Sequence, residues 1–237
     1  MGVAYNTSIV TDGLVFGIDA ANPRCYSGSG ITVNGFTGIG STLVNGVGYS
    51  TSNFGYFTFD GTNDYILSSP TTIETYSNNF TVEFVAKPTR TISLSSESTS
   101  GSAGAYGNKN NLISPEYDDP PSGGFGVALG TNGIEVMEHS AGYLPILMSY
   151  SANLSNINHF IVQVVNKQSN LYVNGTFARQ GLQSLRTSTT LKNNRNLGKG
   201  TYGNYQGQLH SIKFYNRALT AQEIQQNYAA IRGRYGI

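Results

Sequence analysis

Apolar and polar side chains alternate with a period of two along several short segments of the chain. In residues 80–88 one set comprises Phe80, Val82, Phe84 and Ala86, and the intervening set comprises Thr81, Glu83 and Lys87. Successive side chains of a β-strand point to opposite sides of a sheet. The pattern therefore predicts a strand with one face in a core and the other toward solvent or a second layer.

Two further alternating segments are interrupted by residues that favour tight turns. Residues 171–178 contain Asn174-Gly175, which can supply the two positive φ angles of a type I′ turn. Residues 125–134 contain a turn-forming Thr-Asn-Gly at 131–133. We expect a β-hairpin at each place.

Two neighbouring stretches lack periodicity and are rich in loop-forming residues. Residues 93–111 are a Ser, Gly and Asn tract, and residues 114–124 read SPEYDDPPSGG. Only a short apolar pair separates them. We therefore expect a long loop region over residues 93–123, and an N-terminal arm over residues 1–12.

One segment near the end of the chain has the features of an amphipathic helix. Thr220 and Glu223 fit the capping box of a helix N-terminus. The apolar residues that recur at i, i+4 and i+7 are Ile224, Tyr228 and Ile231. Gly233 stands where a glycine commonly ends a helix. The segment predicts a short helix over residues 220–232 that packs on the sheets.

The composition favours many short strands joined by tight turns. Only 11% of the 237 residues are charged, against roughly 25% in ordinary soluble domains. The chain contains 29 glycines and 16 tyrosines, residue types that favour turns and strands respectively. We predict an all-β fold, a two-sheet antiparallel sandwich that forms a single domain over residues 1–237.

Cysteine content, charge and hydropathy disfavour several classes of protein. Cys25 is the only cysteine, so no internal disulfide can form, and we expect it to be a small buried side chain. The net charge of +1 argues against a nucleic-acid partner. No segment approaches the roughly 18 apolar residues of a membrane helix, and the first residues lack a secretion signal. We expect folding in the cytoplasm without membrane insertion.

Acidic and basic residues are unevenly distributed along the chain. Twelve acidic and four basic side chains precede residue 140, whereas Glu223 is the only acid among the ten Lys and Arg that follow. Interleaved early and late strands would disperse this bias. Alternatively, a late basic patch could meet an acidic patch of a neighbouring copy and support a homo-oligomer, with a trimer preferred. The members of that patch would include Arg179, Arg186, Lys192 and Arg195.

Segments spread over most of the chain share motifs with a known family of β-sandwiches. They are residues 12–23, 59–66, 80–88, 159–163, 171–175, 197–198, 207–209 and, most specifically, 214–224. These segments resemble the laminin G-like jelly rolls of the concanavalin A-like lectin and glucanase superfamily. The family usually carries Trp at the position of Val85, and this chain has no Trp. The resemblance implies that the predicted sandwich is a jelly roll.

The last twelve residues, 226–237, resemble versions of the family found in virion and tail-associated proteins of bacteriophages. This implies a non-enzymatic virion structural protein, such as a capsid decoration, fibre or tail-associated subunit. Its location would be the virion, and its partners would be copies of itself and other virion proteins. The alternative is a carbohydrate-binding adhesin that recognises cell-surface glycans of the host. A polysaccharide hydrolase is the least favoured reading.

The acidic residues do not match the paired carboxylates of the glucanases in this superfamily. Two carboxylates share a cleft on a strand when they stand at i and i+2. Glu135 and Glu138 stand at i and i+3, so we expect solvated charges on opposite faces. His139, His159 and His210 have no Cys or second His at metal-ligand spacing. We therefore predict that the protein is not an enzyme.

Two acidic pairs are candidate calcium ligands, because some members of the family bind calcium through loop carboxylates and carbonyls. Asp60 and Asp64 lie in the segment FDGTNDY, where an Asx turn closing a hairpin is the alternative interpretation. Asp118 and Asp119 lie in the long loop region, where a solvated acidic loop is the alternative. Calcium is the one candidate cofactor.

Aromatic and amide side chains in two loops are candidates for glycan binding. The first group is Tyr202, Asn204 and Tyr205, and the second is Tyr106 and Asn108. Aromatic faces stack on sugar C–H groups, and amides hydrogen-bond to hydroxyls. Tyrosine is common throughout this chain, so packing at an edge strand is the alternative role.

Overall fold

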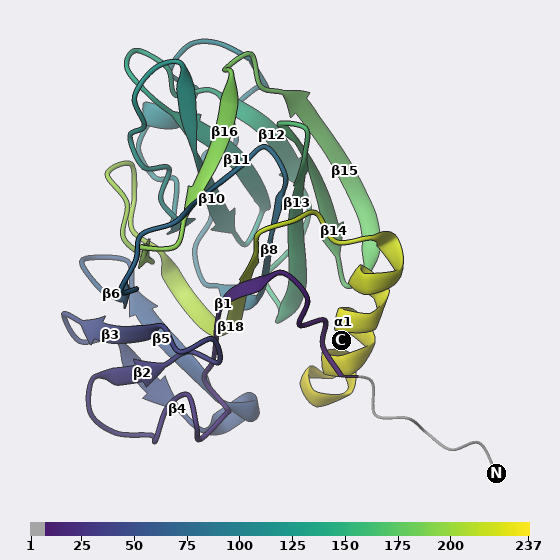
Figure 1. Ribbon diagram of the computed structural model, residues 1–237. Helices are drawn as coiled ribbons and strands as arrows, with labels where there is room; N and C mark the ends of the chain where they lie inside the picture. The colour runs from purple at the N-terminus through teal and green to yellow at the C-terminus, as the bar shows by residue number, and fades with distance from the viewer. Residues whose placement is uncertain (1–7) are drawn as a thin grey trace.

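Two β-sheets lie face to face and enclose the main hydrophobic core (Figure 1). The computed structural model of the protein describes residues 8–237. The eight-stranded sheet, called sheet A here, has seven strands in continuous order and an eighth, β1 (Leu14–Asp19), which pairs with β18. The seven are β15 (Thr176–Gln183), β14 (Gln168–Val173), β13 (Asn158–Val165), β8 (Phe80–Pro88), β18 (Gln206–Tyr215), β5 (Tyr56–Asp60) and β4 (Gly48–Ser50).

The ten-stranded sheet, called sheet B, forms the opposite layer. Its continuous order is β12 (Ile146–Ser151), β11 (Gly133–His139), β10 (Ser122–Gly130), β9 (Asn111–Ile113), β17 (Asn196–Leu197), β6 (Tyr65–Ser69), β3 (Gly40–Val44) and β2 (Thr32–Asn34). Strand β16 (Ser188–Lys192) pairs with β10 and with β7 (Thr75–Ser77). Two 3-10 turns, η1 (Ser52–Phe54) and η2 (Ala103–Ala105), lie between strands.

The sheets are antiparallel, as the sequence predicts, with one exception. Strands β10 and β16 pair in parallel, whereas every other ladder between named strands is antiparallel in the described chain. Strand β18 pairs with β8 along one side. Its other side pairs first with β5 and then with β1. The predicted all-β sandwich is therefore confirmed.

Aromatic side chains from the two sheets fill the core between them. The apolar set predicted for β8 is fully buried there. Phe84 stacks on Phe160 of β13 with ring centroids 5.1 Å apart. Phe80 meets Phe125 of sheet B edge to face, also at 5.1 Å. Such pairs add to the stabilisation that burial of the rings provides.

Both predicted hairpins are present. Strands β14 and β15 are joined by Asn174 and Gly175, whose φ angles of 49° and 74° fit a type I′ turn. Strands β10 and β11 form the other hairpin, closed by the pairing of Gly130 with Gly133. The segment 60–64 differs from its prediction as a hairpin turn. It carries the chain from β5 in sheet A to β6 in sheet B.

The single α-helix in residues 8–237, α1 (Ala221–Tyr235), lies on the outer face of sheet A (Figure 1). Its capping box is formed as predicted, because the Thr220 side chain accepts from the Glu223 amide and the Glu223 carboxylate accepts from the Thr220 amide. The predicted stop at Gly233 is wrong. The helix continues to Tyr235 and ends at Gly236, whose φ of 68° is left-handed. No helix in residues 8–237 combines the length and apolar character needed to cross a membrane.

Replacing Thr220 with Ala should lower the free energy of unfolding by about 1 kcal/mol, because one amide of the first turn loses its acceptor. Gln222→Ala is the matched control, since that side chain is exposed in the same turn. Urea unfolding of both variants measures the difference. Equal stability of the two would contradict the role given to the cap.

A charged cluster lies between α1 and sheet A. The Glu83 carboxylate is fully buried and lies 2.8 Å from the Lys213 ammonium and 3.2 Å from His159 Nε2. Asn227 of α1 donates to the same carboxylate at 2.6 Å. Burial alone would raise the pKa of Glu83, but Lys213 and His159 outweigh it and hold that pKa at about 2.

The first part of the long loop region covers the outer face of sheet B. Apolar side chains from the loop, Ile92, Leu94 and Ala103, pack on Ala128, Met137 and Ile146 of the sheet. The Lys109 ammonium lies 2.7 Å from the Glu135 carboxylate, and both side chains have 0% exposure. This part of the region is therefore a packed layer on the sheet, and the strand β9, which follows it, belongs to the sheet itself.

The prediction that Glu135 and Glu138 are solvated is wrong. Glu138 is also fully buried, where it accepts hydrogen bonds from the hydroxyls of Tyr143, Ser184 and Thr189. Burial raises the pKa of Glu138 above its ordinary value. The two carboxylates have separate sets of partners, so they do not form a catalytic pair.

Most of the basic residues in the later part of the chain form ion pairs with acidic residues from the earlier part. Six of the ten late cations pair with carboxylates that precede residue 140. The pairs are Arg179–Glu97, Lys192–Asp118, Arg195–Glu116, Lys213–Glu83, Arg217–Asp12 and Arg234–Asp19. The fourth member of the proposed basic patch, Arg186, lies over the Tyr143 ring at 4.0 Å. The patch therefore does not support oligomerisation, and the homo-oligomer stays a prediction.

The N-terminal segment is held against α1 where the structure describes it. Residues 1–7 of the predicted arm lie outside the described residues. Val10 donates through its amide to Asn227 and accepts from the Tyr215 hydroxyl through its carbonyl, at 2.7 and 3.1 Å. Cys25 is buried as expected, and burial raises its thiol pKa.

Candidate functional site

A pocket of about 450 Å³ opens on the outer side of sheet B, beside the packed loop layer. Four segments form it: the residues that follow β9, the end of β11, the start of β17, and the loop between β17 and β18. The lining residues are Ser114, Pro115, Glu116, Tyr117, His139, Arg195, Asn196, Lys199, Gly200, Thr201 and Asn204. We call this site the sheet B pocket.

The wall made by residues 114–117 rests directly on the backbone of β10. A Cβ atom added at Gly124 would lie 1.9 Å from the Glu116 carbonyl oxygen, and one added at Gly126 would lie 2.4 Å from the Pro115 nitrogen. Only glycine allows so close an approach of two backbones. The two glycines thus fix the position of the wall.

His139 joins two tyrosines at the back of the pocket. Its Nε2 lies 3.1 Å from the Tyr202 hydroxyl, and its Nδ1 lies 3.3 Å from the Pro115 carbonyl oxygen. The Tyr117 ring meets the imidazole edge to face at 5.3 Å. Burial lowers the pKa of His139, which favours the neutral form of the ring. The Tyr117 side chain is 52% exposed and presents part of its ring to solvent.

Arg195 forms a rigid part of the pocket. It is 3% exposed, and it donates to the Lys192 and Ser114 carbonyls at 3.1 and 3.3 Å. Its Nη1 also lies 3.3 Å from the Glu116 carboxylate. Both charges are therefore held in place before any ligand binds.

The loop between β17 and β18 is braced by the Asn204 side chain. Its Oδ1 accepts from the Gly200 amide at 3.1 Å, and its Nδ2 donates to the Thr62 carbonyl. Lys199, at the start of this loop, lies with its ammonium 4.6 Å from the centroid of the Tyr65 ring. The loop therefore presents a cation held on an aromatic face.

The sequence-predicted glycan residues do not all lie at this pocket. Asn204 lines it, and Tyr202 touches it through His139. Tyr205 is fully buried in the core against Phe59, so its predicted role as a surface binding residue is wrong. It belongs to the inward-facing series that continues along β18.

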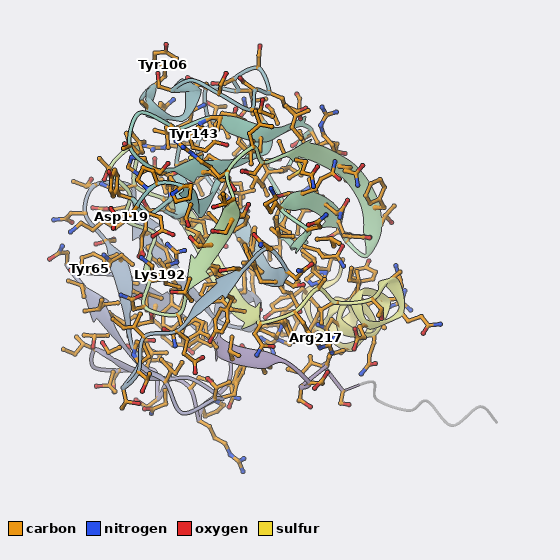
Figure 2. All side chains as sticks on the ribbon, turned by 45° about the horizontal axis from the view of Figure 1, so that its top comes forward. Tyr65, Tyr106, Asp119, Tyr143, Lys192 and Arg217 are labelled. Carbon is orange, nitrogen blue, oxygen red and sulfur yellow. The ribbon has the colours of Figure 1, made fainter. Side chains whose placement is uncertain are left out.

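Tyr106 and Asn108 are exposed, and neither lines the pocket. Figure 2 shows Tyr106 at the upper end of the molecule, well away from Tyr65 and Lys192. Glycan binding by Tyr106 and Asn108 stays a prediction, and the two residues are not part of the sheet B pocket.

The sequence profile of the concanavalin A-like lectin/glucanases superfamily, in its laminin G form, matches residues 60–225. The chain belongs to this superfamily. The match spans both sheets and every segment that lines the sheet B pocket. The resemblance expected from the sequence is thereby confirmed at the level of the superfamily.

Solved structures share the fold of this concanavalin A-like chain at 14% sequence identity. Domain 4 of AbnA, an extracellular GH43 arabinanase from Geobacillus stearothermophilus solved with arabinotriose, has a TM-score of 0.55 over 91% of this chain and 98% of that one. The binding domain of Paraclostridial Mosquitocidal Protein 1 has a TM-score of 0.61, over 91% and 52%. The receptor binding domain of botulinum neurotoxin type G has a TM-score of 0.57, over 92% and 51%.

This chain thus spans about half the length of the two toxin chains. The likenesses show the fold. A comparison with curated proteins finds no match. None of these findings bears on the virion role expected from the last twelve residues, which stays a prediction.

Most of the predicted calcium ligands of this concanavalin A-like chain already accept hydrogen bonds from other groups of the protein. Asp60 accepts from the Thr62 and Asn63 amides, and Asp64 accepts from the Asp60 amide at 3.0 Å. Asp118 accepts from a threonine hydroxyl at 2.6 Å and pairs with a lysine, while Asp119 is exposed. In residues 8–237 no three acidic, His or Cys side chains converge on a point that could hold a metal. Calcium binding stays a prediction.

A second hollow, of about 530 Å³, lies between α1, β1 and the loop around Phe36. Its charged groups are already paired, because Arg234 holds Asp19 at 2.6 and 2.7 Å and Lys213 holds Glu83. The remaining lining is mostly apolar. The sheet B pocket is therefore the candidate site.

The sequence interpretation did not assign Tyr117, His139, Arg195, Asn196 or Lys199 to a binding site. They come from three distant stretches of the chain, at residue 117, at residue 139 and at residues 195–199, so no local spacing connects these stretches. One feature of the sequence could have pointed to this site. The aromatic residue Tyr117 directly precedes Asp118 and Asp119, which were already candidate ligands.

Proposed function

We propose that the chain is a saccharide-binding module and that the sheet B pocket is its binding site. The observation that carries the proposal is a preformed pocket in which a half-exposed Tyr117 ring stands beside fixed polar groups. Its volume of about 450 Å³ lies within the usual range for small-ligand sites.

The lining groups suit the two kinds of surface that a sugar presents. The Tyr117 ring offers an aromatic face to the C–H side of a pyranose or furanose ring. The exposed Asn196 amide can both donate to and accept from hydroxyls, and Arg195 adds buried donors. Rigid placement of Arg195 and Asn204 limits the entropy lost on binding.

The fold supports the proposal without specifying the sugar. A domain that this chain matches over 98% of its length was solved with arabinotriose, so a sandwich of this kind can carry a saccharide. We further propose that binding is not followed by catalysis. The one carboxylate lining the pocket, Glu116, is paired with Arg195, and a second carboxylate for acid-base chemistry is missing from the lining set in the described chain.

The test is a glycan array followed by titration calorimetry on the best ligand, with Tyr117→Ala as the variant. Loss of the stacking face should weaken binding at least tenfold, about 1.4 kcal/mol. Tyr106→Ala is the matched control, because Tyr106 is 66% exposed and does not line the pocket. A wild-type protein that binds no glycan, or a Tyr117→Ala variant that binds as tightly as wild type, would contradict the proposal.

A further inference from the structure

The sheet B pocket is lined by more positive than negative side chains. Its ionised lining residues are Glu116, Arg195 and Lys199. Glu116 and Arg195 neutralise each other at 3.3 Å. The pocket therefore carries the positive charge of Lys199 in excess.

Lys199 is available for a ligand. Its side chain forms no salt bridge with any carboxylate in residues 8–237. Its ammonium lies 4.6 Å from the Tyr65 ring, and this contact holds the cation without using its hydrogen-bond donors on an anion. The residue itself is exposed.

The nearby acidic residues do not cancel this charge. Asp118 faces Lys192 at 3.5 Å and also accepts from Thr190. Asp119 is exposed, and it is not among the lining residues. An ammonium with unused donors forms its strongest hydrogen bonds with an anionic oxygen.

We propose that the pocket selects saccharides that carry a carboxylate, with Lys199 pairing to the acid group while the sugar ring lies against Tyr117. This inference rests on the proposed function and names the class of ligand. Uronic acids and sialic acids both supply the required group. Neutral sugars would leave the Lys199 charge without a partner.

The experiment compares matched ligands that differ in the acid group. Sialyllactose is compared with lactose, and an oligogalacturonate with its methyl ester, by calorimetry at about 50 and 500 mM NaCl. In at least one pair we expect the carboxylated member to bind about tenfold more tightly, with the advantage reduced at high salt because the pair is exposed. The pair that shows the preference identifies the source of the carboxylate.

Lys199→Gln should abolish the preference for the carboxylated member of the pair. Arg232→Gln is the matched control, because it removes one exposed positive charge from α1, on the opposite sheet. An effect of equal size in both variants would assign the preference to overall charge and overturn the role of Lys199.

The remaining outcomes separate the two proposals. Equal binding of neutral and carboxylated members, still sensitive to Tyr117→Ala, would overturn this inference and keep the saccharide site. Tight binding of a sulfated oligosaccharide without any binding of the carboxylated ones would also overturn it. Failure to bind any saccharide would overturn the proposed function itself.

Discussion

Replacing Glu83 with Gln is expected to lower the free energy of unfolding by about 3–5 kcal/mol. The substitution leaves Lys213, which is 3% exposed, without its counter-charge at 2.8 Å. A buried ion whose partner has been removed keeps the full cost of its desolvation. The double variant Glu83→Met with Lys213→Met should recover part of the loss, because it removes both charges but leaves the Asn227 amide without this acceptor.

Urea unfolding at pH 7 measures this effect, with Asp119→Asn as a control at an exposed carboxylate. The control should lie within about 0.5 kcal/mol of wild type. A Glu83→Gln variant that is as stable as this control would show that the cluster under α1 contributes nothing to stability.

Glu83→Gln should also change how the free energy of unfolding depends on pH in the acid range. The pKa of Glu83 is about 2 in the folded protein, against an ordinary value of 4.5. The unfolded chain therefore takes up this proton first, and the stability due to Glu83 is complete above pH 4.5 and lost as pH falls toward about 2. The difference corresponds to roughly 3 kcal/mol. Wild type should lose this amount over that range, and Glu83→Gln should lose less.

Replacing Lys109 with Met is expected to cost a similar amount, about 3–5 kcal/mol, and to loosen the loop layer over sheet B. The Lys109 ammonium lies 2.7 Å from Glu135, 2.7 Å from the Ser93 carbonyl and 2.8 Å from the Ser95 hydroxyl. It thus ties the start of the loop to β11. Hydrogen exchange and limited proteolysis should locate new exposure within residues 92–110.

The pH dependence of this variant has the opposite sign. Burial raises the pKa of Glu135, and Lys109 opposes that rise. Without Lys109 the folded-state pKa rises further, so Lys109→Met should be more stable at pH 5 than at pH 7. Lys199→Met is the matched control, because Lys199 is an exposed lysine with no carboxylate partner in the described chain. Equal stability of the two variants would contradict the tethering role.

The elements that could be predicted from the sequence depend on nearby residues. The alternation of residues 80–88, the Asn174-Gly175 turn and the Thr220 cap each place the deciding side chains within a few positions of one another. The end of α1 was misplaced because Gly233 fits inside a helix at modest cost, whereas Gly236 adopts the left-handed conformation.

The candidate site could be predicted only in part, because it depends on how distant segments meet. Tyr202 and Asn204 were identified from local chemistry, whereas Arg195 and Lys199 became site residues only through the pairing of β17 with β6 and β9. Glu135 illustrates the same limit. Its burial requires Lys109, and nothing in the spacing of the two residues indicates that pairing.

The central place of β18 in sheet A has a consequence for synthesis of the protein. This strand, residues 206–215, separates β8 from β5 and β1, which are made much earlier. The emerging chain cannot close the hydrogen-bond ladder of that sheet until residues 206–215 have left the ribosome. Until then β8 and β5 expose unpaired edges, which are the surfaces through which nascent chains aggregate. Completion of sheet A therefore has to wait until β18 has been made, long after the strands on either side of it.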